Sequence, residues 1–103
     1  MHKVALITGA SRGIGRETAR VLSERGYTVI VNYSRSQEAA EQLVAQLRAN
    51  GGDAEAVCAD VGDAAQVSAM IDDVLRRYGR IDALVNNAGI AQQKLLGDVT
   101  DAE

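Results

Sequence analysis

Four short apolar runs alternate with longer segments of helical periodicity along the chain. Each run has the length of a strand and is apolar at successive positions rather than only at alternate ones. The runs lie at Val4–Thr8, Thr28–Asn32, Ala54–Ala59 and Ile81–Asn86. Such strands predict a parallel sheet covered by helices on both faces, because right-handed crossovers place the connecting helices there.

The segments between the runs predict three amphipathic helices, each ending at a glycine. The first spans about Gly13 to Arg25, the second spans about Ser36 to Asn50, and the third follows the third strand. Asp63 and Gln66 have the spacing of a capping box at the start of the third helix. The side chains expected to face the core are Ile14, Thr18, Val21 and Leu22 in the first helix, Ala40, Leu43, Val44 and Leu47 in the second, and Val67, Met70, Ile71, Val74 and Leu75 in the third.

This alternation predicts an α/β fold with a doubly wound parallel sheet of Rossmann type. Such folds usually have the strand order 3-2-1-4, which here leaves Ile81–Asn86 at an exposed edge of the sheet. We therefore expect this chain to be weakly stable or to self-associate.

Length, charge and cysteine content narrow the class of protein. The 103 residues correspond to about one small domain, and the net charge of −3 offers no basic field for nucleic acid or for a membrane surface. No signal-peptide core precedes the first strand, which favours a cytoplasmic location. The only cysteine, Cys58, argues against a disulfide scaffold, and we expect it to be a buried thiol in a strand.

A glycine-rich turn connects the first strand to the first helix. Residues 8–15 read Thr-Gly-Ala-Ser-Arg-Gly-Ile-Gly. In a dinucleotide-binding fold, the first glycine permits a tight turn, and the later ones let the backbone approach a pyrophosphate and the helix approach the sheet. Gly9, Gly13 and Gly15 match these roles, with an ordinary glycine-rich turn as the alternative. No Lys-Ser/Thr pair follows, which excludes a P-loop ATPase.

The segment after the second strand bears on cofactor preference. Asn32-Tyr33-Ser34-Arg35 offers no carboxylate to the hydroxyls of an adenosine ribose, and no acid appears before Glu38. Arg12 and Arg35 suit a 2′-phosphate instead, and Ser34 can donate a hydrogen bond to it. We therefore expect NADP(H) to be favoured over NAD(H), with a solvated Arg35 ahead of a helix as the alternative.

Further candidate contacts follow the third and fourth strands. Because Asp63 and Gln66 already cap the next helix, we expect Asp60 to be free to accept a hydrogen bond from the adenine amino group. Asn87, Ala88 and Gly89 follow the fourth strand, at the edge where open α/β sheets bind ligands. The alternative interpretation of these three residues is an ordinary polar turn after the strand.

Three motifs in this order resemble the short-chain dehydrogenase/reductase family. They are the Thr-Gly-x3-Gly-x-Gly turn, Asp60-Val61, and the Asn-Asn-Ala-Gly segment that begins at Asn86. The turn is most similar to those of the family's acyl-carrier-protein reductase and glucose dehydrogenase-like members. The resemblance implies a homo-oligomeric oxidoreductase that transfers hydride between a nicotinamide cofactor and a carbonyl or alcohol substrate. It implies cofactor contacts at Gly9, Ser11, Arg12, Gly13, Ile14, Gly15, Ser34, Arg35, Asp60, Val61, Asn87, Ala88 and Gly89.

The catalytic pattern of that family, a Ser followed by a Tyr-x3-Lys pair, is absent from this sequence. None of Tyr27, Tyr33 and Tyr78 is followed four residues later by a lysine. We therefore assign no catalytic residue and no metal ligand. The Thr-x-x-Glu spacing at residues 100–103 is typical of a helix start, which predicts a C-terminally truncated domain over residues 1–103, or else a disordered polar tail. A non-catalytic dinucleotide-binding module or sensor and an inactive truncation are the alternative functions.

Overall fold

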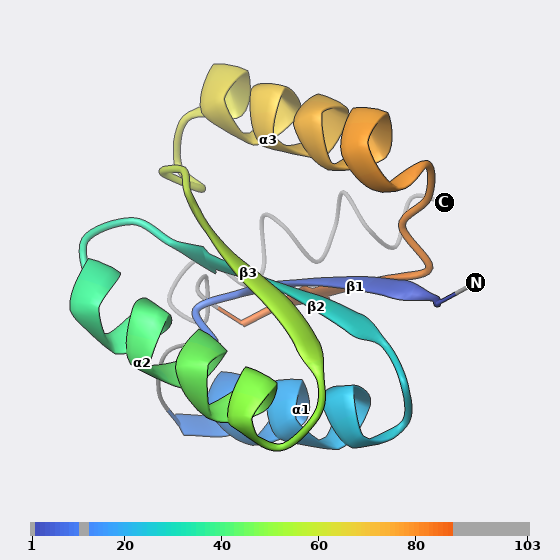
Figure 1. Ribbon diagram of the computed structural model, residues 1–103. Helices are drawn as coiled ribbons and strands as arrows, with labels where there is room; N and C mark the ends of the chain where they lie inside the picture. The colour runs from blue at the N-terminus through green and yellow to red at the C-terminus, as the bar shows by residue number, and fades with distance from the viewer. Residues whose placement is uncertain (1, 11–12, 88–103) are drawn as a thin grey trace.

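The computed structural model describes residues 2–10 and 13–87 of the chain (Figure 1). Strands and helices alternate in these residues as the sequence predicts, and each boundary lies within two residues of the expected one. The elements are β1 (Val4–Thr8), α1 (Gly13–Glu24), β2 (Thr28–Tyr33), α2 (Gln37–Ala49), β3 (Asp53–Cys58), α3 (Ala64–Tyr78) and β4 (Ala83–Asn86). None of the helices in the described residues is long and apolar enough to cross a membrane.

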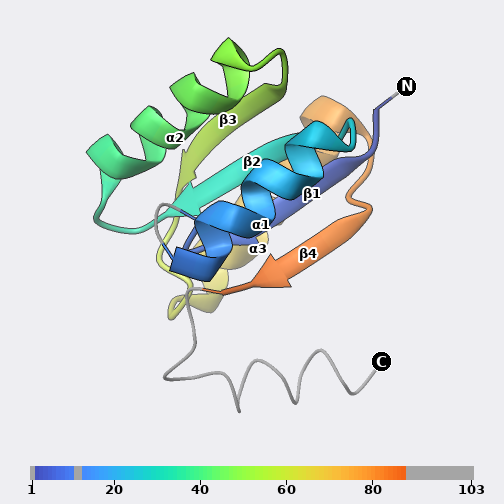
Figure 2. The ribbon, with the colours of Figure 1, turned by 90° about the horizontal axis from the view of Figure 1, so that it is seen from below.

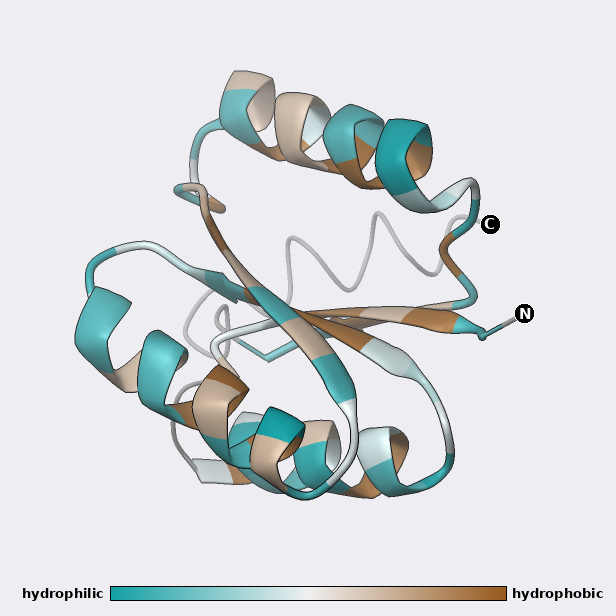
Figure 3. Cartoon of the chain, in the orientation of Figure 1, coloured by the Kyte–Doolittle hydropathy of each residue, from teal (hydrophilic) through white to brown (hydrophobic). Residues whose placement is uncertain are grey.

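The strands form one parallel sheet in the order β3-β2-β1-β4, which confirms the predicted topology. Figure 1 shows α1 and α2 on one face of the sheet and α3 on the other. Neighbouring residues of a strand therefore enter different cores: Ile7 packs with the α1 and α2 side chains, whereas Leu6 packs with those of α3. Figure 3 shows hydrophobic colour along the central strands and hydrophilic colour on the outward turns of α2 and α3.

The buried side chains of α2 are those predicted, namely Ala40, Leu43, Val44 and Leu47. In α3, Met70 and Val74 are buried and Ile71 is partly buried, but Leu75 is 43% exposed.

The predicted inward face of α1 is wrong at two of its four residues. Ile14 is 71% exposed and Val21 is 43% exposed, whereas Gly15 and Ala19 are the buried residues of this helix. Thr18 is half-buried, and its hydroxyl donates to the Ile14 carbonyl at 2.9 Å. The physical reason is size, because two small residues one turn apart let the helix backbone approach the sheet closely. Of the expected large side chains, Leu22 packs partly buried against the core.

Cys58 also differs from the prediction, because it is exposed rather than buried. It is the last residue of β3, which has a neighbouring strand on one side only. Burial accordingly decreases from Ala54, which is buried, to Cys58 at the end of the strand. The thiol lies 3.8 Å from the Ser34 carbonyl, to which it donates a weak hydrogen bond.

Strand β4 lies at the other edge of the sheet, as predicted, with Leu84 55% exposed (Figure 2). Asp82 fixes its start to β1, because the Val4 amide donates to Asp82 Oδ2 and the Asp82 amide donates to the Val4 carbonyl, both at 2.7 Å. The hydrogen-bonded ion pair with Arg80 and the bond from Val4 lower the pKa of Asp82. This contact sets the register that places Thr8 opposite Asn86 at the carboxyl ends of β1 and β4.

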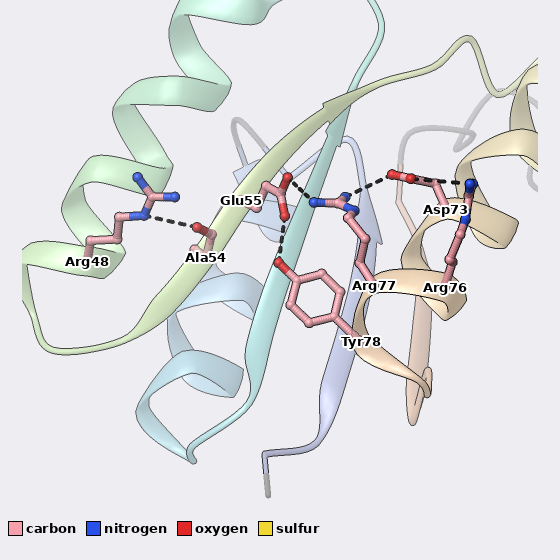
Figure 4. Close-up of polar contacts among 7 residues, drawn as sticks. All are labelled: Arg48, Ala54, Glu55, Asp73, Arg76, Arg77 and Tyr78. Carbon is pink, nitrogen blue, oxygen red and sulfur yellow. Dashed lines mark hydrogen bonds and ion pairs between the residues drawn. The ribbon is translucent and has the colours of Figure 1, made fainter.

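A polar network joins β3 to the last turn of α3 (Figure 4). The Tyr78 hydroxyl donates to Glu55 Oε1 at 2.5 Å, and Arg77 pairs with both Glu55 and Asp73. Burial alone would raise the pKa of Glu55, but the bonds from Tyr78 and Arg77 outweigh it and lower that pKa. Burial and the bond to Glu55 raise the pKa of Tyr78 to about 12.

Candidate functional site

The carboxyl ends of all four described strands lie at the same end of the sheet, and the residues predicted to bind a cofactor follow them. Gly9, Gly13, Ile14 and Gly15 follow β1, Ser34 and Arg35 follow β2, Asp60 and Val61 follow β3, and Asn87 follows β4. The other predicted contacts, Ser11, Arg12, Ala88 and Gly89, lie outside the described residues.

The turn between β1 and α1 requires glycine for its backbone conformation. Gly9 has φ of 63° and Gly13 has φ of 64°, in the left-handed region that side chains disfavour. A Cβ atom at Gly13 would have no described atom within 4 Å, so there is open space beside the start of α1. The first turn of α1 contains no acidic residue, and its first amides have no acceptor within the helix. These features fit a bound phosphate group.

Gly15 is required for a different reason, namely close packing. A Cβ atom there would lie 2.5 Å from the Gly9 carbonyl oxygen and 2.6 Å from Asn87 Nδ2. These distances are shorter than real Cβ contacts, so a side chain would push α1 away from the turn. Gly9 and Gly13 thus set the path of the turn, and Gly15 lets the helix pack closely against it.

Thr8 and the end of β4 hold the glycine turn in place. The Thr8 hydroxyl accepts a hydrogen bond from the Asn87 amide at 2.8 Å and donates to Asn86 Oδ1 at 3.0 Å. Asn87 Nδ2 in turn donates to the Gly9 carbonyl at 3.3 Å. No separate role for Thr8 was predicted, although a hydroxyl at the buried end of an apolar strand is the signal that points to one.

The residues after β2 are open to solvent. Ser34 and Arg35 are exposed, and a shallow hollow beside them is lined by Arg35, Ser36, Gln37, Glu38, Ala39 and Glu41. Ser36 is the N-cap of α2, but its side chain makes no capping hydrogen bond. The first amides of α2 therefore lack a side-chain acceptor from their cap, as an anion site needs. Glu38 and Glu41 partly offset the charge of Arg35 in this hollow.

Two residues at this edge were not predicted as part of the site. Tyr33 and Cys58 are paired across β2 and β3, directly before the exposed segments. Burial, the neighbouring Cys58 and the charge of Glu41 raise the pKa of Tyr33, so it remains a neutral phenol at physiological pH. Both side chains belong to strand ends, where alternation alone does not distinguish a core position from the rim.

The segment after β3 is held by a compact set of hydrogen bonds. Asp63 caps α3, accepting from the amides of Ala65 at 3.0 Å and Gln66 at 3.3 Å, which confirms its predicted role. Asp60, which is predicted to accept from the adenine amino group, uses one carboxylate oxygen within this segment, because Asp60 Oδ1 accepts from the Gly62 amide at 2.9 Å. Its other oxygen has no hydrogen-bond partner among residues 2–10 and 13–87, and Asp60 is exposed.

Comparison with known proteins identifies relatives of this arrangement. The family model described as short chain dehydrogenase matches residues 3–103. Over its full length the chain is 50% identical to a 3-oxoacyl-acyl-carrier-protein reductase of Staphylococcus aureus, and it covers 42% of that protein. It is also 50% identical over 101 residues to versicolorin reductase 1 of Aspergillus parasiticus, of which it covers 38%.

Solved structures agree with these sequence relatives. A metagenomic short-chain oxidoreductase crystallised in complex with NADP superposes with a TM-score of 0.80 at 40% sequence identity. The superposition covers 84% of this chain and 38% of that one. Acetoin dehydrogenase from Enterobacter cloacae gives a TM-score of 0.77 at 37% identity and is covered over 34% of its length. The chain therefore spans less than half the length of the relatives it matches.

Proposed function

Because this chain belongs to the short chain dehydrogenase family, we propose that it binds the pyrophosphate of a nicotinamide dinucleotide at the start of α1. We further propose that the whole protein is an oxidoreductase, transferring hydride between this cofactor and a carbonyl or alcohol substrate. The geometry of the glycine turn carries the first proposal. Gly9 and Gly13 bend the chain, Gly15 admits the helix, and the space beside Gly13 is open. Helix amides facing that space favour a negatively charged group.

Two further side chains at this end of the sheet suit other parts of the cofactor. Ile14 is 71% exposed at the first turn of α1, where an apolar side chain suits a ring of the cofactor. Asp60 retains one uncommitted carboxylate oxygen for the adenine amino group. When bound, the cofactor supplies the hydride chemistry. The described residues of this chain bind and orient it, and we assign none of them a proton-transfer role.

We propose that the cofactor is NADP(H) rather than NAD(H). Three observations support this. Arg35 and Ser34 are exposed after β2, no carboxylate lies between the end of β2 and Glu38, and the Ser36 side chain leaves the start of α2 without a capping bond. The short-chain oxidoreductase that is 40% identical to this chain was crystallised with NADP. A hydrogen bond to a charged group is worth roughly 1.5–3 kcal/mol, which corresponds to about a tenfold to hundredfold difference in affinity.

Calorimetric titration with NADPH and NADH tests this proposal. Arg35→Ala is expected to weaken NADPH binding by about tenfold or more while leaving NADH binding nearly unchanged. Arg25→Ala is the matched control, because Arg25 is also exposed but lies at the opposite end of α1. Equal loss of both cofactors in Arg35→Ala would contradict the assigned 2′-phosphate contact.

A non-catalytic dinucleotide-binding module is the second candidate. Its supporting observation is that the described residues supply a glycine turn for binding and contain no tyrosine followed four residues later by lysine. The two candidates differ in turnover: the module binds NADPH without consuming it, whereas the oxidoreductase oxidises NADPH when a carbonyl substrate is added. Absorbance of the reduced nicotinamide during such an incubation distinguishes them.

A further inference from the structure

We propose that Gln66 is a positioning residue for adenine recognition, holding Asp60 in the orientation that meets the adenine amino group. This inference rests on the proposed function. Gln66 is exposed in the first turn of α3, and its side chain bonds in two directions. Its Oε1 accepts from the Asp60 amide at 2.8 Å, and its Nε2 donates to Asp63 Oδ2 at 3.2 Å.

The hydrogen bond of Gln66 differs from that of an ordinary capping box in the amide that it reaches. In a capping box, the side chain three residues into the helix returns to the amide of the N-cap residue itself. In this chain Asp63 is the N-cap, but Gln66 reaches past it to the amide of Asp60, three residues earlier. The bond therefore connects the helix start to the proposed adenine contact.

The other side of the segment is fixed to the sheet. The Ala59 amide donates to the Tyr33 carbonyl at 2.9 Å, and the buried Asn32 side chain donates to the Ala59 carbonyl at 3.2 Å. Asp60 thus lies between Ala59, which is anchored to β2, and Asp63, which is anchored to α3. The bond from Gln66 is the contact that holds the Asp60 amide itself.

The consequence concerns orientation more than stability. Asp60 and Gln66 are both exposed, so water can replace their hydrogen bond when the glutamine is removed, and folding changes little. Water does not fix the direction of the Asp60 backbone, however. Without Gln66, the Asp63 amide still donates to the Asp60 carbonyl at 3.0 Å and Gly62 still bonds Oδ1, but the Asp60 amide loses its protein acceptor. The other carboxylate oxygen is then held less firmly, and recognition of the adenine amino group weakens.

The test compares NADPH with its hypoxanthine counterpart, in which a carbonyl oxygen replaces the adenine amino group. The wild-type protein is expected to prefer NADPH by about tenfold or more, because a carboxylate accepts from the amino group and repels the carbonyl. Gln66→Met has a similar side-chain length but neither hydrogen-bonding group. It is expected to lose about threefold or more of that preference, chiefly through weaker NADPH binding.

Gln46→Met is the matched control. Gln46 is also an exposed helix glutamine that bonds another element, accepting from Arg16 Nη2 at 3.0 Å, but it lies in α2 and makes no bond to residues 59–62. It is expected to keep the wild-type preference. Gln66→Glu retains an acceptor for the Asp60 amide but sets a second carboxylate against Asp63 Oδ2, so it is expected to keep only part of the preference, though more than Gln66→Met. Gln66→Ser, which is too short to reach the Asp60 amide, replaces Gln66→Met if that variant melts too low to be measured, and it is expected to lose the preference to the same extent.

The outcomes separate this inference from the proposed function. A wild-type protein that binds neither dinucleotide contradicts both. A wild-type protein that binds NADPH and its hypoxanthine counterpart equally, or a folded Gln66→Met that keeps the full preference, overturns the positioning role and leaves dinucleotide binding standing. A merely structural glutamine would lower the melting temperature without changing the ratio of the two affinities.

Discussion

At the scale of single residues, the site depends on contacts that leave no room for an added atom. Gly15 lies against the Gly9 carbonyl and the Asn87 side-chain amide, and the Thr8 hydroxyl accepts from the Asn87 backbone amide. The tight turn at Gly9 and the close packing at Gly15 could be predicted because the spacing of the glycines between a strand and a helix is specific. The double use of Gln66 could not, because its spacing from Asp63 indicates a capping box and is silent about Asp60.

Gly15→Ala is expected to destabilise the fold by about 1–3 kcal/mol, the usual cost of forcing an extra group into a packed site. The nearest atom belongs to the backbone of Gly9, which cannot move aside as a flexible side chain can. Chemical denaturation of the two proteins measures the difference. Ser68→Ala, on the exposed face of α3, is the control expected to stay within about 0.5 kcal/mol of the wild type. A Gly15→Ala protein as stable as this control would contradict the close approach.

At the scale of elements, the pattern of large apolar side chains predicted the buried faces of α2 and α3 well but not that of α1. The inward face of α2 carries leucine and valine, which the helical period identifies. In α1 the inward positions are Gly15 and Ala19, and a pattern read from large side chains favours the neighbouring Ile14 and Val21 instead. Only small residues fit there because the backbone of α1 lies close to the sheet. The hydrophobic period of a sequence does not reveal such a close approach.

The attachment of α3 to β3 predicts a dependence of stability on pH. The pKa of Glu55 is lowered in the folded state. The stabilisation that ionised Glu55 gives to the fold is therefore present above its ordinary pKa of 4.5 and is lost as the pH falls through the folded pKa. Glu55→Gln is therefore expected to cost about 1 kcal/mol at neutral pH and to flatten the decline of the unfolding free energy in acid. Urea titrations over a pH series measure this, with Glu24→Gln as control. If the unfolding free energies of wild type and Glu55→Gln depend on pH in the same way, the network does not contribute to the acid dependence of stability.

At the scale of the whole molecule, the alternation of strands and helices predicted a doubly wound parallel sheet. The strand order 3-2-1-4 was predicted because such folds usually have it. The exposure of Cys58 was not predicted, although the predicted order 3-2-1-4 places its strand at an edge, because an apolar run does not reveal where burial ends along a strand. The chain covers 42% of a reductase to which it is 50% identical. The cytoplasmic location and homo-oligomeric state of the whole protein remain predictions.

The exposed edge at β4 predicts concentration-dependent self-association of this chain. Leu84 is 55% exposed there, and within residues 2–10 and 13–87 β4 has a neighbouring strand on one side only, so its outer backbone groups can pair with a second copy. Leu84→Lys is expected to reduce association in sedimentation velocity, because an edge lysine must lose its hydration to be paired. Leu75→Lys, on the exposed side of α3, is expected to leave association unchanged. A wild-type chain that stays monomeric at all concentrations and melts cooperatively would contradict this prediction.

The central claim is that backbone amides at the start of α1 bind the pyrophosphate of a nicotinamide dinucleotide. Nuclear magnetic resonance of the nitrogen-labelled chain during NADPH titration tests it most directly, because it reports binding and its location together. The amide signals of Gly13, Ile14 and Gly15 are expected to shift and saturate together, while those of Gly26 and Gly51, at the opposite ends of the helices, stay in place. A dispersed spectrum in which the three amides do not move at excess NADPH would contradict the account.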